Sequence, residues 1–479
     1  MPGQTEGTVK QKTAARKERE LKLAFNDLLY QDALLHVSDS DSSMDYGTDS
    51  EFGTESDYSD SNDDDDDGDD DDDDNTLLQL LLKEEKLLRD WLVHHENHVK
   101  MKRLNKRISQ STRSRRSFHE YFDNLPDGTP RFTKRQMRNL FRFETIEEID
   151  EIIGVLDLPE YFHTRHRCKF TGKEAFLLLL TTLARERRTL EDLVNDGFTF
   201  GSHSAGSEII NYINRWVYYK WAQPLLSMEL KAWVGSVERF RRAIRARIDT
   251  IRNWRPEHFL PDLGRDTCFH IDGTVYKILR PTHDTESFYN GRYKQQQIVY
   301  LAIIAPNGLC VRFGGCFTGR THDSNAYGQE DIAWEMERLN AKYKELYGDE
   351  DSRFVIYGDS AYRKSATLEK PLYSRAGLTD AEYRHNHMMS KLRVDVERYF
   401  GLAKNQFKYA ASGCIKIEQS PYRNGDDTKV FDMRVWNSFL MQNFMTCMRH
   451  NGISQSNDCA PPDLKTYVGM RNDYYHENE

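Results

Sequence analysis

The chain has 479 residues, enough for two or three domains, and its seven cysteines show no CxxC spacing, which argues against a zinc knuckle or a disulfide framework. No apolar run approaches the roughly 18 residues of a membrane span, and the first residues, MPGQTEGTVKQK, hold no apolar signal region, so we expect an intracellular protein without membrane contact. The net charge of −10 is the sum of −18 over residues 1–75 and +8 over the remainder, and this asymmetry is typical of nucleic-acid binders.

Residues 1–75 are predicted to be a disordered acidic leader. The run from Asp63 to Asp74 is interrupted only by Gly68, and charge of one sign at this density cannot bury a core. The simplest interpretation is a solvated tail. The alternatives are an electrostatic mimic of DNA that competes for the basic part of the chain, or a docking site for basic partners.

Residues 76–122 are predicted to form an amphipathic helix followed by a basic linker. Leucines and Trp91 recur at helical spacing among Glu and Lys. The segment 100–116 then holds eight Lys and Arg side chains. It is a nuclear localisation signal, an arm that contacts phosphates, or a solvated linker.

Residues 123–260 are predicted to be a helical region that resembles a helix-turn-helix. Thr171 with Glu174 and Thr189 with Asp192 fit the pattern of N-terminal helix caps. The predicted helices cover 172–187, 190–195 and 207–221. A helix, a short helix, a turn and a longer helix form the skeleton of a DNA-reading unit, although any small three-helix bundle satisfies the same pattern.

A further helix at 238–255 is rich in arginine. Several of its arginines share a face that is suited to DNA phosphates, with Arg239 and Arg242 as the candidates, while the alternative is a solvated arginine face. The full set is Arg239, Arg241, Arg242, Arg245, Arg247 and Arg252.

Residues 261–450 change from helical to strand periodicity and are predicted to form a nuclease domain. Asn307-Gly308 between two β-rich runs indicates a hairpin. The predicted strands cover 267–278, 296–304, 308–319 and 354–357, and the predicted helices cover 324–346 and a last segment that opens near Lys391. The order β-β-β-α-β-α around one mixed sheet is what an RNase H-like α/β fold requires. Residues 451–479 are taken as a C-terminal tail.

Three acids stand where this fold would bring them together. Asp272 lies in a strand before Gly273, Asp359 ends an apolar strand, and Glu397 lies on the last helix. Phosphodiester cleavage uses two divalent cations about 3.5–4 Å apart, and Mg²⁺ prefers carboxylate oxygens. A strand-end Asp alone is more often a turn or cap residue, so the order and context of the three acids carry the prediction.

The stretch 268–410, with a further block near the end of the domain, resembles the DDE nuclease domain of Harbinger/PIF-type transposases, the DDE Tnp4-like group of DDE superfamily endonucleases. The blocks that carry the resemblance are HIDGT, FTGRTHDSNAY, YGDSAY, EYRHNHMMSKLRVDVERYFGLAKNQFKY and NSFLMQNFMTCMRHN, in that order. The resemblance implies that Asp272, Asp359 and Glu397 are the catalytic and metal-binding acids, with Mg²⁺ or Mn²⁺, two ions per site. It also implies a separate Myb-like protein that assists DNA recognition and nuclear import.

Several nearby residues have competing interpretations. Asp395 lies two residues before Glu397, roughly 200° around a helix, so only one of the two can face the site, and the V-E-R-x-F-G block favours Glu397. Asp323 is a fourth ligand or, as we favour, a supporting or helix-capping residue. The remaining candidates are His270 and His322, read as structural histidines, and Lys404 and Lys408, read either as phosphate contacts or as ordinary surface lysines.

The sequence therefore predicts a nuclear, metal-dependent DNA endonuclease and strand transferase that nicks double-stranded DNA at element ends, and we expect a homo-oligomer. The main alternative is a domesticated, non-catalytic nuclear DNA-binding protein derived from a transposase. A third is a host RNA-processing nuclease on the same fold. The intact triad argues against the non-catalytic DNA-binding protein, because a protein that only binds DNA would tolerate the loss of an acid.

Overall fold

The computed structural model describes residues 118–165, 168–186, 189–253, 264–281, 285–410, 413 and 426–476. The predicted acidic leader and the basic segment 100–116 lie outside these residues, so the predictions made for them are not tested. Within the described part of the chain, no helix combines the length and the apolar character that a membrane crossing requires.

The chain from Phe118 to Val217 is mostly helical and contains one short antiparallel hairpin. The predicted caps are confirmed, because Thr171 and Thr189 each form a capping box at a helix start. The helix predicted from 207 begins earlier, at His203, where Ser202 accepts the Ala205 N–H. The elements are α3 (His119–Phe122), α4 (Lys134–Phe141), α5 (Ile146–Leu156), β1 (Tyr161–His163), β2 (Lys169–Thr171), α6 (Gly172–Ala184), α7 (Leu190–Asn195) and α8 (His203–Val217).

The next helices lead from this region to the sheet. The π-helix η1 (Tyr218–Ala222) follows α8 directly and passes into α9 (Gln223–Leu226). A 3₁₀ turn, η2 (Leu230–Trp233), then opens the arginine-rich α10 (Val234–Asn253). This last helix packs against strand β3 (Thr267–Lys277), so it forms part of the layers around the sheet.

The central sheet is mixed, as predicted, and has the hairpin expected at Asn307-Gly308. Its strand order is β4-β5-β3-β7-β8, with β6 paired to β5. Strand β3 is antiparallel to β5 and parallel to β7, which gives the mixed character of an RNase H-like domain. Besides β3, the elements are α11 (Thr285–Phe288), β4 (Tyr289–Asn290), β5 (Gln295–Ile304), β6 (Cys310–Thr318), β7 (Val355–Tyr357) and β8 (Leu368–Glu369).

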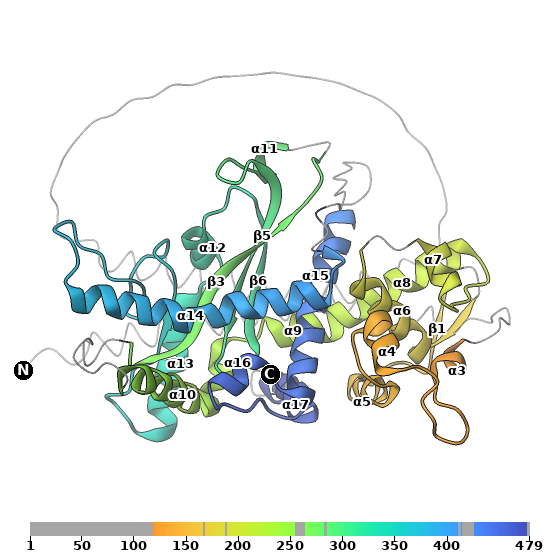
Figure 1. The fold of residues 1–479 in the computed structure, drawn as a ribbon, viewed down its shortest axis with the longest axis horizontal. Helices are drawn as coiled ribbons and strands as arrows, with labels where there is room; N and C mark the ends of the chain where they lie inside the picture. Colours follow the sequence, from red (N-terminus) through yellow and green to blue (C-terminus); the bar gives the residue numbers. More distant parts are fainter. Residues whose placement is uncertain are drawn as a thin grey trace, which may run out of the picture. The chain divides into compact units, whose positions relative to one another are not determined.

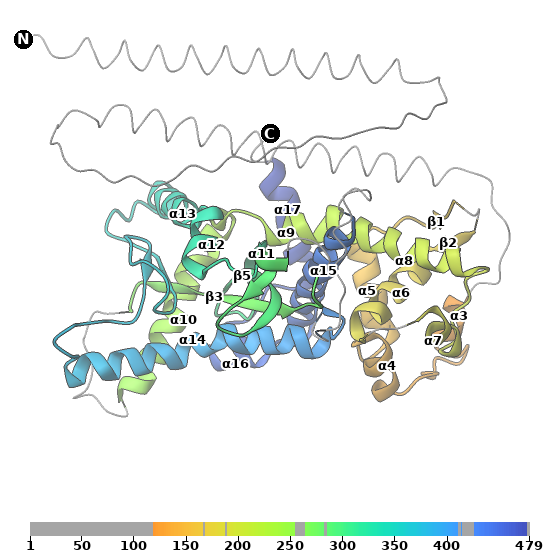
Figure 2. The ribbon, with the colours of Figure 1, turned by 90° about the horizontal axis from the view of Figure 1, so that it is seen from above.

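Long helices cover both sides of this sheet (Figure 1). In Figure 2, α14 (Asp380–Gln406) runs along one side, while α12 (Asp323–Gln329) and α13 (Ile332–Tyr347) lie on the opposite side. Helix α15 (Asp426–Arg449) packs between the sheet and the helical region, and α16 (Gly452–Ser456) and α17 (Leu464–His476) follow it. The predicted alternation of strands and helices is therefore confirmed.

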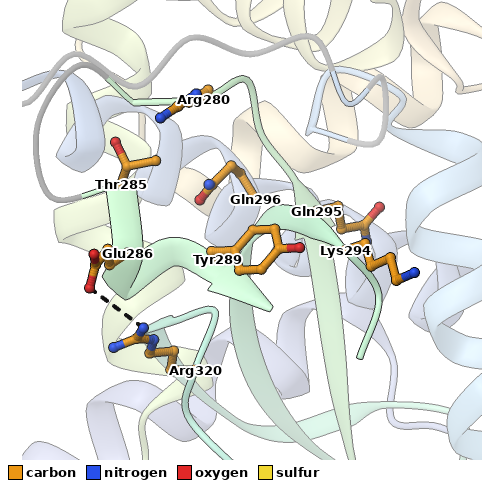
Figure 3. Close-up of a pocket in the computed structure, with 8 residues that line it drawn as sticks. All are labelled: Arg280, Thr285, Glu286, Tyr289, Lys294, Gln295, Gln296 and Arg320. Carbon is orange, nitrogen blue, oxygen red and sulfur yellow. Dashed lines mark ion pairs between the residues drawn. The ribbon is translucent and has the colours of Figure 1, made fainter. Parts of the chain in front are cut away.

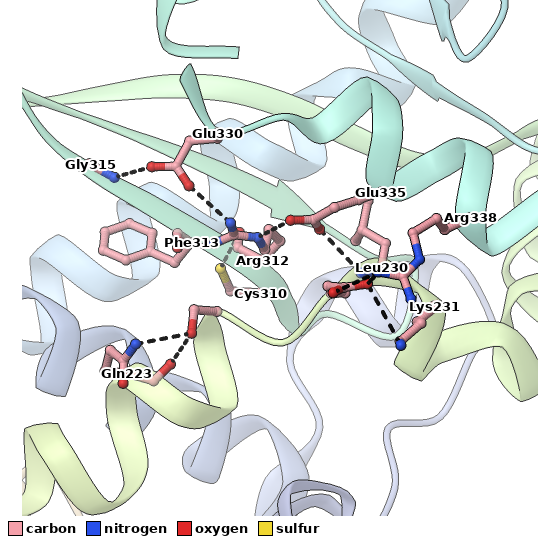
Figure 4. Close-up of polar contacts among 12 residues, drawn as sticks. Gln223, Leu230, Lys231, Cys310, Arg312, Phe313, Gly315, Glu330, Glu335 and Arg338 are labelled. Atoms are coloured by element: carbon pink, nitrogen blue, oxygen red, sulfur yellow. Dashed lines mark hydrogen bonds and ion pairs between the residues drawn. The ribbon is translucent and has the colours of Figure 1, made fainter. Parts of the chain in front are cut away.

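Two predicted helices differ from the structure. The prediction of one helix over 324–346 is wrong, because Asp331 adopts a left-handed φ of 51° and separates α12 from α13. The buried Arg312 of β6 stabilises this break by pairing with Glu330 at 2.9 Å and with Glu335 at 3.2 Å (Figure 4). The predicted start near Lys391 is also wrong, since α14 begins at Asp380, eleven residues earlier.

One continuous hydrophobic core joins the helical region to the sheet. The ring centroids of Phe313 on β6 and Phe439 on α15 lie 4.0 Å apart, and the Asn437 amide donates to the backbone oxygen of Asn214 on α8 at 2.9 Å. The described cysteines are free thiols and most are buried, which agrees with their interpretation as reduced core residues. The predicted domain boundary near residue 260 therefore stays a prediction.

Candidate active site

Two of the predicted acids lie at the same level of adjacent parallel strands, Asp272 within β3 and Asp359 just after the end of β7. His270 of β3 pairs with Tyr357 of β7 in parallel register, and Asp272 and Asp359 each lie two residues beyond this pair. Neighbouring strands are about 4.8 Å apart, and residues in register share a face. The sheet therefore places the two carboxylates side by side.

A third carboxylate, that of Asp323, reaches the same place from the first turn of α12. Atoms of Asp272, Asp323 and Asp359 all lie within 4.8 Å of one another. A Cβ atom added at Gly273 would collide with the Asp323 carboxylate, so the missing side chain provides the space that this acid occupies. Asp323 does not cap α12, because the cap position belongs to His322 and shows no side-chain hydrogen bond.

Glu397 lies beside this cluster and is connected to it by an arginine. Arg393, one helical turn earlier on α14, donates to Asp272 through Nη1 and to Glu397 through Nη2, the latter at 2.6 Å. The Arg393 side chain is 17% exposed and that of Glu397 is 52% exposed. The structure thus brings Asp272 and Asp359 together with Asp323 and places Glu397 across Arg393 from Asp272.

Burial and mutual repulsion shape the charges of the cluster. Burial raises the pKa of Asp272 to about 6; Asp359 adds to the rise, while Arg393 opposes it. Burial and Asp359 also raise the pKa of Asp323. Acids that are held together against repulsion attract a cation.

Tyr362, in the loop after Asp359, lies beside the acid cluster. Like Arg393, it is a residue of the site that was not predicted from the sequence. It is fully buried, and burial together with the three neighbouring aspartates raises the pKa of its hydroxyl. This hydroxyl has no hydrogen-bond partner among the described residues. It is therefore a donor with an unmet hydrogen bond next to a cluster of carboxylates.

The donor chemistry of the cluster fits a hard divalent cation. Three carboxylates converge from a strand, a strand end and a helix start, and oxygen ligands are those that Mg²⁺ and Mn²⁺ prefer. Among the described residues, the group of ligand atoms within 4.8 Å of one another contains no histidine. Burial lowers the pKa of His270 to about 4, and Arg247 and Arg393 act in the same direction.

Asp395 points to a different part of the molecule from Glu397. It is 2% exposed and accepts hydrogen bonds from Arg247 at 2.6 Å and from Asn457 at 2.9 Å. These contacts connect α14 to α10 and α16. Asp395 therefore has a structural environment, and Glu397 is the acid of this pair that lies beside the cluster.

The four predicted DNA-binding cations have different surroundings. Arg239 and Arg242 are exposed on α10, where Arg242 donates to Glu238 at 2.8 Å. Lys404 donates to the Val275 carbonyl at 2.9 Å, and burial lowers its pKa to about 8. Lys408 is exposed just beyond the end of α14. Three of the four are therefore exposed, while Lys404 is partly buried and bonded to β3.

The part of the chain that holds this site is similar to one known protein family. Residues 271–431 match the family model described as DDE superfamily endonuclease. The match includes the three clustered aspartates and Glu397, and it ends at Phe431, in the first part of α15. Neither curated proteins nor solved structures gave a match. Residues 271–431 are accordingly similar to a DDE superfamily endonuclease domain, which supports the predicted resemblance at this coarser level.

Proposed function

We propose that the protein is a metal-dependent DNA endonuclease and strand transferase of the Harbinger transposase type. The observation that carries the proposal is the convergence of Asp272, Asp323 and Asp359 within 4.8 Å, inside a region that matches DDE superfamily endonucleases. Such a protein nicks DNA at element ends, and the freed 3′-hydroxyl then attacks target DNA. The alternative is a non-catalytic DNA-binding descendant of a transposase.

We propose Asp272, Asp323 and Asp359 as ligands of one cation and Glu397 as the acid that completes a two-ion site with Asp272. A bound Mg²⁺ or Mn²⁺ would supply Lewis acidity and an activated water. The residues of the chain hold the geometry: β3 and β7 position two aspartates, and Gly273 admits the third. Arg393 holds Glu397 close to Asp272 and balances the charge of both.

Double-stranded DNA is the proposed substrate, and its phosphates would meet the exposed cations Arg239, Arg242 and Lys408. The helix-turn-helix-like unit has a weaker case. Most of α8 is buried, and its exposed side carries few charges, of which Glu208 accepts the Arg165 N–H. A nuclear location, a Myb-like partner and a homo-oligomer remain proposals that rest on the resemblance and on the segment 100–116.

The test is nicking of supercoiled plasmid with Mg²⁺ or Mn²⁺ by the full chain. Asp359→Asn keeps the volume of the side chain and removes its charge, so we expect nicking to fall at least about 100-fold, because several kcal/mol of transition-state stabilisation is lost. Nicking by the Asp323→Asn protein should fall by a similar factor if Asp323 is a ligand. The exposed Asp351→Asn is the matched control, with nicking equal to wild type. If neither the wild type nor Asp359→Asn nicks the plasmid, and both still bind DNA, the result would favour the non-catalytic alternative.

A further inference from the structure

A cavity of about 560 Å³ lies beside the hairpin that joins β4 to β5. Its lining includes Arg280, Lys294 and Arg320, which come from three separate segments of the chain, and the ring of Tyr289 (Figure 3). In this view the tyrosine lies in the middle of the group, with Arg280 and Arg320 on either side of it. The acid cluster does not contribute to this lining.

The cavity favours an anionic ligand. Glu286 is the single acid among the residues that line it; its side chain is 87% exposed, and its carboxylate lies 3.7 Å from the Arg320 guanidinium. Three cations against one acid leave a net positive charge. Because guanidinium groups bind phosphate oxygens in a planar, two-point manner, the two arginines suit a phosphate group.

The cavity also offers contacts for a flat, polar group. Tyr289, which lines the cavity, is 41% exposed, and Tyr293, at the tip of the same hairpin and outside the lining, is 54% exposed. The Arg292 guanidinium lies 5.5 Å from the centroid of the Tyr293 ring. The side-chain oxygen of Gln296 is buried and has no hydrogen-bond partner among the described residues. Phosphate, aromatic stacking and an unsatisfied acceptor together describe a nucleotide site.

The wall of this cavity is connected to the active site. Arg320 lies three residues before Asp323, in the loop between β6 and α12. Its backbone N–H donates to Ser287 at 3.3 Å, and the Asn290 amide donates to the Gly319 carbonyl at 2.9 Å. The loop that presents Asp323 to the acid cluster is therefore attached to the segment that carries Tyr289.

We propose that this cavity holds an unpaired nucleotide of the DNA strand that the active site cuts, an inference that rests on the proposed nuclease function. Tyr289 stacks on the base, Gln296 accepts a hydrogen bond from it, and Arg280, Lys294 and Arg320 contact the adjoining phosphates. The volume is that of a small-molecule site. It has no room for a duplex, whose major groove alone is about 12 Å wide.

The test compares two DNA duplexes that bind to the full chain in EDTA, so that no cutting occurs. One duplex is blunt, and the other has a two-nucleotide single-stranded 3′ extension that contains 2-aminopurine. We expect tighter binding of the extended duplex, with quenched 2-aminopurine fluorescence. Tyr289→Ala should reduce this preference about 5- to 100-fold because base stacking is lost, and Arg320→Ala should weaken the binding of the extension.

Matched controls separate stacking from folding. Tyr289→Phe keeps the ring and should retain the preference, and Tyr347→Ala removes an exposed tyrosine of α13 (55%, against 41% for Tyr289) and should have no effect. Equal affinity for both duplexes, an unchanged preference in Tyr289→Ala, or tighter binding of an RNA extension would each overturn the proposal. A protein that shows the Tyr289-dependent preference and does not nick plasmid would support the cavity and refute the nuclease.

Discussion

Asp272 carries the largest electrostatic cost among the clustered acids, and this cost predicts how the metal-free protein responds to pH. Its pKa is about 6 in the folded protein because of burial and Asp359, against about 3.9 in an unfolded chain. The folded state therefore binds the proton more tightly, and stability falls as pH rises from about 4 to about 6. Above pH 6 the full cost is present.

Asp272→Asn is accordingly expected to stabilise the metal-free protein at pH 8, by up to about 3 kcal/mol, while it abolishes nicking. The measurement is urea unfolding in EDTA at pH 4 and pH 8. The variant and the wild type should differ at pH 8 and nearly converge at pH 4, where Asp272 is protonated in the folded state and about half protonated in the unfolded chain. A variant that is less stable than wild type at pH 8 would contradict the assigned repulsion.

Added Mg²⁺ serves as the control for this explanation. A cation that binds only the folded state raises the free energy of unfolding by mass action, so wild type should gain stability at pH 8 and Asp272→Asn should not. The gain in wild type should shrink below pH 6, because a protonated carboxyl group is a poor ligand. The pH dependence thus separates charge repulsion from a loss of packing.

At the scale of elements, the break between α12 and α13 positions Asp323. Arg312 pairs with Glu330 just before the break and with Glu335 just after it, and Glu335 is 2% exposed. Glu335 also accepts the Leu230 N–H at 3.2 Å, and Glu330 accepts that of Gly315 at 3.0 Å. The arginine thus connects the start of α13 and the end of α12 to strand β6.

Arg312→Met is expected to lower the free energy of unfolding by about 3–5 kcal/mol, because it leaves a buried carboxylate without its counter-charge. Nicking should also fall at temperatures where the variant is still folded, since α12 and Asp323 lose their support. Urea unfolding measures the first effect and plasmid conversion the second. The triple variant Arg312→Met, Glu330→Gln, Glu335→Gln should recover much of the stability. If Arg312→Met unfolds within about 1 kcal/mol of wild type, the pairing contributes little.

Some elements of the fold are determined by local sequence, and others depend on residues that are distant in the chain. The caps at Thr171 and Thr189 could be predicted because a capping box is formed by residues three apart. Thr379 and Glu382 form the same box at the start of α14, so the correct start could have been predicted from T-x-x-E. The break at Asp331 was not, because it depends on Arg312 in a strand that is distant in sequence.

The residues of the active site also differ in how far local sequence predicts their positions. Asp272 and Asp359 were predicted from their places within one strand and at the end of another, from their order along the chain and from the family resemblance. The place of Asp323 depends on the path of the loop before α12 and on the space above Gly273, which no local pattern contains. Arg393 could have been suspected, since residues four apart on a helix share a face, and its second partner, Asp272, appears only in the folded chain.

At the scale of the whole molecule, the helical region and the nuclease region share one core, and α15 is where they meet. This helix is buried almost all round from Phe431 to Thr446, which is the pattern of a helix surrounded by protein. On one side it packs against α8, η1 and α9, and on another against β6 and α14. Trp436 illustrates both contacts, because its ring lies 5.9 Å from that of Tyr218 and 5.0 Å from that of Phe313.

A chain that begins at Leu230 is therefore expected not to fold cooperatively, even though it keeps α10, the whole sheet and the four acids. Its α15 would expose several large apolar side chains, each worth about 1.5–3 kcal/mol, against a total stability of about 5–15 kcal/mol. Circular dichroism during urea unfolding measures this, with a chain that begins at Phe118 as the control, for which we expect one sharp transition. A sharp transition and metal-dependent nicking from the shorter chain would show that the nuclease region is an independent domain, and that α3–α9 serve another purpose than completing its core.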